Sequence, residues 1–172
     1  CRTYKGRHSA FKKLQKKRNH FNRFQANRPD YRVEPIGCGN LARVQHMVND
    51  WYVSRRKSDP DGEYLLESLA MAKAFRHFDE LNMEGLALLD GDEVLAMTMG
   101  SRLSPTTFDI HFEKAREDAD GAYPAINCEF ARYIRAKYPE IQFLNREEAQ
   151  YKPVRRVPSF SKLLIISSID KL

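Results

Sequence analysis

The side chains best suited to acid–base chemistry lie between residues 106 and 148. His111 and Glu113 stand two residues apart in an alternating run, so we predict that both lie on one strand face beside Asp109. Acyl transfer needs a base that takes a proton from an amine or hydroxyl, and donors aimed at the developing oxyanion. His111 and Glu113 are therefore the candidate catalytic residues, although a strand with one solvated face would carry the same residues without any task.

Two further groups of polar residues flank this run. Lys114 ends it, and we expect Lys114 to bind substrate in one cleft with His111, Glu113, Asn127 and residues 145–148. The loop before the next helix carries Gly121, whose neighbouring backbone N–H groups could hold a phosphate. The same loop could equally be a plain turn in which Asp120 caps the helix. Acidic residues crowd the loop, which disfavours a phosphate there.

The last candidates lie in the helix and beyond it. Asn127 follows Tyr123 by one helical turn, so these two share a face, whereas Glu129 points elsewhere. The polar run Asn145-Arg-Glu-Glu148 follows a short strand. It could bind an amino group and a phosphate or carboxylate, or it could simply be solvated. We expect substrate-binding roles for Tyr123, Asn127, Asn145, Arg146 and Glu147.

Hydrophobic periodicity predicts the elements that hold these residues. The pattern favours a central strand over residues 106–114, with Phe108, Ile110 and Phe112 on its buried face, then a helix over 123–137 and a strand over 141–144. Upstream it favours a strand over 31–36, helices over 40–56 and 63–80, and a hairpin over 86–99. We expect the third helix to bury Leu65, Leu66, Leu69, Ala70, Phe75 and Phe78. The order predicts an α+β fold with a mixed, mostly antiparallel sheet of about six strands flanked by helices.

Composition limits the function classes. A chain of 172 residues with 30% charged residues suits one globular domain, and it has no apolar run of the roughly 18 residues that span a bilayer. The three cysteines form no pair or zinc-ligand spacing, so we expect reduced thiols, a cytoplasmic setting and no metal site.

The net charge of +6 is concentrated at the start of the chain, because residues 1–29 hold ten Lys or Arg and no acid. We predict that residues 1–30 form a basic amphipathic helical segment, helical over 8–25, ahead of a single domain at 31–172. Such a block suits tRNA or an anionic membrane surface. The predicted polyanion-binding residues are Lys12, Lys13, Lys16 and Lys17, and the apolar stripe that should dock the helix is Phe11, Leu14, Phe21 and Phe24.

Several short motifs follow one another along the chain, and each occurs once. They are Lys17-Arg-Asn-His20, Trp51, Phe78-Asp-Glu-Leu81, Gly100-Ser101, His111-Phe-Glu-Lys-Ala115, Gly121-Ala-Tyr123 with Ile126-Asn127, and Asn145-Arg-Glu-Glu148. From about Lys5 to Pro153 the chain thereby resembles the phosphatidylglycerol lysyltransferase C-terminal domain family, which is built from GNAT-like acyltransferase units. Arg18 of the first motif lies in the apolar stripe, so either its stem packs while its head reaches water or it binds a phosphate or carboxylate of the substrate. The resemblance implies that Asn19 also contacts substrate.

The resemblance implies transfer of an aminoacyl group from aminoacyl-tRNA to a lipid or another amine or hydroxyl acceptor, with no tightly bound cofactor. Family members often carry two GNAT-like units, so a second half or a homodimer is an expected partner, and the inner membrane face an expected location. The loop at Gly121 lacks the Arg/Gln-x-x-Gly-x-Gly/Ala pattern by which relatives hold coenzyme A. An acetyl-CoA-dependent N-acetyltransferase and a non-catalytic polyanion-binding module are the alternatives. We expect Glu113→Gln to fold normally and lose transfer by about 100-fold.

Overall fold

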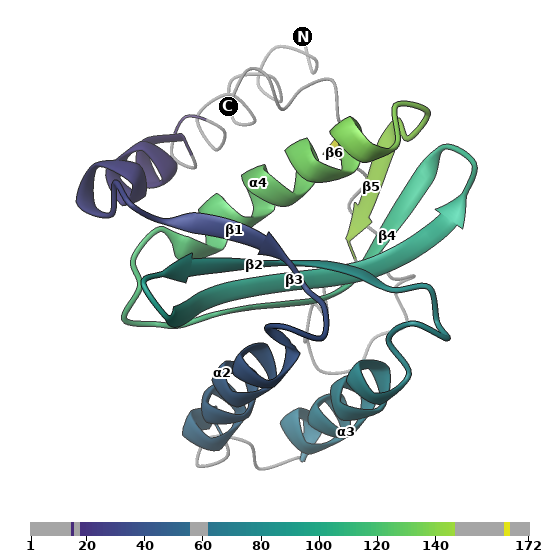
Figure 1. Ribbon diagram of the computed structural model, residues 1–172, viewed down its shortest axis with the longest axis horizontal. Coiled ribbons are helices and arrows are strands. Elements are labelled where there is room, and N and C mark those ends of the chain that lie inside the picture. The colour runs from purple at the N-terminus through teal and green to yellow at the C-terminus, as the bar shows by residue number, and fades with distance from the viewer. Residues whose placement is uncertain (1–14, 16–17, 56–61, 147–163, 166–172) are drawn as a thin grey trace, which may run out of the picture.

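A computed structural model describes residues 15, 18–55, 62–146 and 164–165 (Figure 1). A helix over residues 18–27 precedes the labelled elements. These are β1 (Arg32–Pro35), α2 (Leu41–Arg55), α3 (Glu63–Arg76), β2 (Glu84–Asp90), β3 (Glu93–Ser104), β4 (Thr107–Ala115), α4 (Ala122–Lys137), β5 (Phe143–Arg146) and β6 (Leu164–Ile165).

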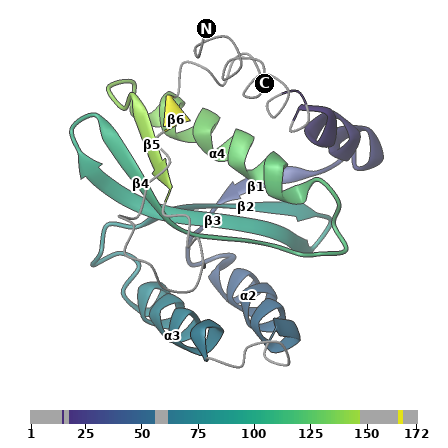
Figure 2. The same ribbon diagram turned by 180° about the vertical axis from the view of Figure 1, so that it is seen from behind.

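The six strands form one sheet in the order β1-β2-β3-β4-β5-β6. All neighbours are antiparallel except β4 and β5, which run parallel because α4 carries the chain back across the sheet. The helix over 18–27 and α4 lie on one face, and α2 and α3 lie on the other (Figures 1 and 2). The predicted α+β fold is confirmed. The two-residue β6 was not predicted, since its apolar run is too short to show a period.

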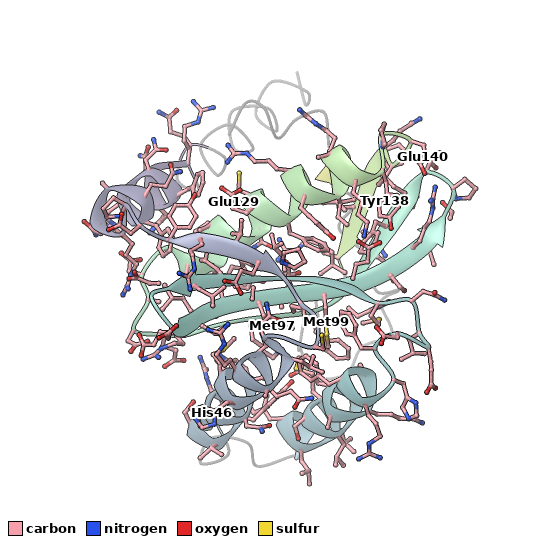
Figure 3. The ribbon with its side chains drawn as sticks, viewed as in Figure 1. His46, Met97, Met99, Glu129, Tyr138 and Glu140 are labelled. Atoms are coloured by element: carbon pink, nitrogen blue, oxygen red, sulfur yellow. The ribbon has the colours of Figure 1, made fainter. Side chains whose placement is uncertain are left out.

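Two separate cores hold the helices to the sheet. Phe108, Ile110 and Phe130 belong to the core on the α4 face. Met97 and Met99 of β3 belong to the core on the α2–α3 face, and Figure 3 shows them on that side of the strand. None of the described helices is both long and apolar enough to span a bilayer.

The helix over residues 18–27 is docked on the α4 face. Phe21 and Phe24 are 5% and 1% exposed and belong to the α4-face core. The predicted apolar stripe therefore packs on the domain at these two residues. The rest of the stripe, Phe11 and Leu14, and the four candidate polyanion-binding lysines lie outside the described residues.

The prediction for the third helix was wrong for its first half. Leu65, Leu66 and Leu69 are 48%, 69% and 60% exposed, and Ala70 is exposed as well. The buried side of α3 instead carries Met71, Ala74 and Phe75. Because apolar residues occur on both sides of this helix, its sequence period does not identify the buried face. The helix also ends at Arg76, four residues earlier than predicted.

Candidate active site

A β-bulge in β4 determines which side chains reach each face of the sheet. Met99 of β3 lies opposite Phe112, but the next residue, Gly100, lies opposite Ile110, so His111 is an extra residue in β4. The predicted alternation is therefore wrong beyond Ile110. Phe112 packs against the α2–α3 core rather than the α4 core, and Glu113 does not share a face with His111.

Gly100 is required at this bulge because the two strands approach very closely. A Cβ at Gly100 would lie 1.9 Å from the carbonyl oxygen of Asp109 and 2.9 Å from the Cα of Ile110. These are backbone atoms, which cannot rotate away as a side chain can. Any larger residue would push β3 and β4 apart at the position of His111.

On the α2–α3 face, two hydrogen-bonded pairs of polar side chains meet at the contact between His111 and Asp109. Its Nε2 lies 2.9 Å from Ser101 Oγ, and its Nδ1 lies 3.6 Å from Asp109 Oδ2. Asn145 Nδ2 donates to Asp109 Oδ1 at 2.8 Å. We call these four residues the imidazole cluster. Asp109 and Asn145 are 5% and 8% exposed, whereas 30% of the His111 side chain is exposed.

This arrangement favours one tautomer of His111. The carboxylate of Asp109 favours a proton on Nδ1, which leaves the Nε2 lone pair directed at the hydroxyl of Ser101. Asn145 of β5 in turn holds the carboxylate, since the parallel register places it beside Asp109. The cluster thus has the chemistry of an oriented general base.

On the α4 face, Glu113, Arg146 and Tyr123 form an ionic cluster, and Tyr123 is 45% exposed at its edge. Arg146 Nη2 donates to Glu113 Oε2 and also to the Tyr123 hydroxyl at 2.8 Å. The Tyr123 hydroxyl donates to the same Glu113 oxygen at 3.0 Å. The side chains of Glu113 and Arg146 are 10% and 6% exposed. Burial raises the pKa of Tyr123 to about 12, and the negative charge of Glu113 adds to this rise.

Asn127 borders this ionic cluster through Tyr123. Its Nδ2 donates to the Tyr123 carbonyl at 2.9 Å, as their spacing of one helical turn allows. Its Oδ1 is buried and has no hydrogen-bond partner among the described residues. Glu129 lies elsewhere, as expected, and accepts hydrogen bonds from Tyr31 and Arg132; Figure 3 labels it on α4.

Lys114 does not join either cluster. It is 8% exposed, and its Nζ lies 2.8 Å from Glu67 Oε1 and 4.4 Å from the centroid of the Trp51 ring. Its ammonium also lies near Tyr52, whose pKa is raised by burial and by Glu67. The interpretation that Lys114 lines one cleft with Glu113 is therefore wrong, because successive residues after the bulge face opposite sides of the sheet.

The loop before α4 is closed by the N-terminal helix. Gly121 has φ of 83°, and a Cβ there would lie 2.7 Å from the His20 carbonyl oxygen and 2.8 Å from Phe24 Cβ. Asp120 does not cap α4 as one alternative held; its carboxylate forms an ion pair with Arg23. The approach to the helix N-terminus is thus occupied by residues 20–24. Arg18 and Asn19 lie on the exposed side of that helix.

One hollow lies apart from the predicted site. This hollow of about 740 Å³ lies between α2 and the loop after β4, lined by residues that include His46, Asp50 and Arg116. None of the predicted catalytic or substrate-binding residues lines it. Glu147 lies outside the described residues.

Sequence reasoning did not assign a role to Ser101 or Asp109. Both belong to the imidazole cluster because the shifted register places Ser101 opposite Asp109, one residue before the bulge. The glycine before Ser101 was the available signal, since glycine inside a strand marks a bulge or a close approach.

The comparisons with known proteins agree with this architecture. The profile of the family "Phosphatidylglycerol lysyltransferase, C-terminal" matches residues 10–160. A conserved protein of unknown function from Bacteroides thetaiotaomicron superposes with a TM-score of 0.66 and 34% identity, over 74% of this chain and 43% of that one. The chain thus spans less than half the length of that relative. A search of curated proteins found no match.

More distant structures share the fold alone. An acetyltransferase from Streptococcus agalactiae has a TM-score of 0.51 and 10% identity, over 72% of this chain and 76% of that one. A putative acetyltransferase of the GNAT family from Desulfovibrio desulfuricans has a TM-score of 0.50 and 10% identity, with 71% and 76% covered. With the family profile matching most of its length, the chain belongs to the phosphatidylglycerol lysyltransferase C-terminal domain family and has an acyltransferase-type GNAT fold.

Proposed function

We propose that this protein transfers an aminoacyl group from aminoacyl-tRNA to an amine or hydroxyl acceptor, with His111 as the general base. The observation that carries the proposal is the imidazole cluster. His111 is partly exposed, oriented by the buried carboxylate of Asp109, and placed where β4 passes beyond its pairing with β5. A base in this position can take a proton from an acceptor on the α2–α3 face of the sheet.

The chemical step is an ordinary acyl transfer. Removal of a proton from the acceptor lets its oxygen or nitrogen attack the carbonyl carbon of the aminoacyl ester. The bond between that carbon and the ribose oxygen of the tRNA then breaks. The ribose oxygen takes up the proton, so the products are the acylated acceptor and free tRNA.

His111 is a better candidate for the base than Glu113, because Glu113 already has strong partners. Its Oε2 accepts hydrogen bonds from Arg146 and from Tyr123, and its side chain is only 10% exposed. The carboxylate oxygen that would take the proton is therefore already engaged by a guanidinium and a phenol. We therefore assign Glu113, Arg146 and Tyr123 to holding β4, β5 and α4 together beside the reacting centre.

The loop before α4 supports aminoacyl-tRNA over acetyl-CoA as the donor. Residues 20–24 fill the space next to Gly121, and Arg23 neutralises Asp120 across the same gap. A pyrophosphate at this helix N-terminus would have to displace the docked helix. The neighbouring Asp118 would also repel it, although Arg116 pairs with that carboxylate at 2.7 Å. An acyl-CoA donor remains the alternative that the GNAT fold offers.

A donor comparison tests the proposal. The protein is incubated with bulk tRNA charged with labelled amino acids and with vesicles containing an anionic phospholipid, and label extracted into chloroform is measured. A parallel reaction contains labelled acetyl-CoA in place of the charged tRNA. We expect transfer from charged tRNA and none from acetyl-CoA. Transfer from acetyl-CoA, together with a rise in melting temperature on adding coenzyme A, would overturn the proposed donor.

The basic segment is the proposed contact for tRNA or the anionic membrane face. Reversing the charges of Lys12, Lys13, Lys16 and Lys17 should abolish binding to tRNA or to anionic vesicles and flatten its salt dependence. Binding that survives all four reversals would remove this role. If binding is lost by charge reversal but no donor supports transfer, the protein is a polyanion-binding module instead.

A further inference from the structure

Both ring nitrogens of His111 are already occupied. Nδ1 faces the carboxylate of Asp109 at 3.6 Å, and Nε2 lies 2.9 Å from the hydroxyl oxygen of Ser101. With the proton on Nδ1, the lone pair on Nε2 accepts the Ser101 hydroxyl proton. An acceptor molecule therefore meets the oxygen of Ser101 where it would otherwise meet the imidazole lone pair.

The hydrogen bond of Ser101 differs from those of the other described serines. Ser54 and Ser68 donate to backbone carbonyls three residues earlier in their own helices, at 2.7 Å each. Ser104, on the same strand as Ser101, accepts from the backbone N–H of Thr106. These three hydroxyls serve local backbone structure. The hydroxyl of Ser101 instead points at an ionisable ring ten residues away in sequence and on the next strand.

The backbone holds Ser101 in this position. Ser101 is opposite Asp109 in the register, and Gly100 before it allows the close approach of β3 and β4. The buried amide of Asn145, on β5, donates a hydrogen bond to the carboxylate of Asp109. Three neighbouring strands thus orient one hydroxyl and one imidazole relative to each other. Ser101 itself is only partly buried, unlike Asp109 and Asn145.

We propose that Ser101 is a further catalytic residue, which carries the acceptor's proton to His111. As the acceptor attacks the acyl carbon, its proton moves to Ser101 Oγ while the hydroxyl proton of Ser101 moves to His111 Nε2. When the ester bond breaks, the imidazolium returns a proton through Ser101 to the departing oxygen. Serine and histidine end as they began, and no bond forms between Ser101 and the acyl group.

This inference rests on the proposed transfer reaction, and one set of variants tests it. Ser101→Ala removes the relay, Ser101→Thr keeps a hydroxyl, and Ser104→Ala removes a serine of the same strand that serves only the backbone. We expect Ser101→Ala to lower kcat by about 100-fold with little change in the KM of either substrate. Ser101→Thr should retain most of kcat, and Ser104→Ala should match the parent protein.

The proton transfer itself gives a second readout. Two protons move in one step, so the parent rate should depend on the square of the deuterium fraction in mixed H₂O and D₂O. Full activity in Ser101→Ala, or a linear dependence in the parent protein, would overturn the relay. Intact-mass detection of an aminoacyl adduct on Ser101 would also overturn it, since Ser101 would then be a nucleophile.

A substrate-free measurement separates failure of this inference from failure of the proposed function. In protein labelled with ¹⁵N-histidine, Ser101→Ala should shift the Nε2 resonance of His111, whereas Ser104→Ala should not. An unchanged resonance would show that the Ser101 hydrogen bond does not exist in solution and would refute the relay. If no donor supports transfer but the resonance shifts as expected, the serine–histidine pair stands and only the assigned reaction fails.

Discussion

Each face of β4 carries a largely buried carboxylate, but the two carboxylates have different partners. On the α4 face, the charge of Glu113 is cancelled by Arg146 and fixed by Tyr123. On the α2–α3 face, the carboxylate of Asp109 meets a neutral ring and an amide, and no guanidinium contacts it among the described residues. The first arrangement holds three elements together, whereas the second leaves a proton acceptor at an accessible position.

This contrast separates a structural role from a chemical one. The Oε2 atom of Glu113 is engaged by a guanidinium and a phenol, so we assign that carboxylate to structure. The carboxylate of Asp109 instead orients an imidazole and leaves the other ring nitrogen directed at a hydroxyl. Substitutions on the two faces should therefore differ in whether they reduce stability or activity.

The largest effect is expected at Gly100. Gly100→Ala places a Cβ against backbone atoms of Asp109 and Ile110, so it should disturb the bulge and both clusters together. We expect a loss of more than about 4 kcal/mol in the free energy of unfolding, measured by urea denaturation. Gly39→Ala is the matched control, because nothing lies within 4 Å of its added Cβ. Equal stability of the two variants would show that the bulge is not rigid.

The next effect should be confined to chemistry. His111→Gln removes the base but keeps a polar side chain, so transfer should fall by about 1000-fold while the unfolding midpoint changes little. His46→Gln, at an exposed position of α2, is the control and should leave both quantities unchanged (Figure 3). A fully active His111→Gln protein would exclude the imidazole cluster as the reacting centre.

The ionic cluster should show the opposite pattern. Glu113→Gln removes the carboxylate of a buried ion pair with Arg146, so we expect a loss of about 3 kcal/mol, or roughly 6–12 °C in Tm. Combining it with Arg146→Met should recover part of that loss, since neither charge is then buried alone. A Glu113→Gln protein of normal stability that transfers about 100-fold more slowly would instead restore Glu113 as the base, as its sequence position suggested.

The smallest effect is expected at Tyr123. Tyr123→Phe removes the phenol that bonds both Glu113 and Arg146, but the ion pair itself stays, so we expect a loss of about 1 kcal/mol. Because the pKa of Tyr123 is raised to about 12, its phenol stays protonated at neutral pH. The number of tyrosines that ionise below about pH 11 in a spectrophotometric titration should therefore be equal in Tyr123→Phe and the parent. One fewer in the variant would show an exposed, unperturbed phenol.

Local pattern was sufficient to predict most of the fold. The apolar stripe of α4 and the Asp90-Gly91 turn depend on residues close in sequence, and both elements form where predicted. The faces of β4 depend instead on how β3 pairs with it. Nothing in the alternation around Phe112 reveals that His111 is an extra residue, so Glu113 and Lys114 were assigned to one cleft. The exposed leucines of α3 were misassigned for the same reason, because tertiary contacts select the buried face.

The bulge has a consequence for how this strand tolerates change. Every residue of β4 after His111 occupies the face that it would occupy if His111 were deleted, because the shifted register absorbs one position. His111 is thus an extra residue in the packing pattern. Its removal would eliminate this register shift and keep both cores in phase, and the other register shift, between Arg102 and Ser104, would be unaffected. The candidate base is therefore an inserted residue that does not change which of the other β4 side chains face each core. A single-codon insertion or deletion could then add or remove the histidine base with little change in the stability of the fold.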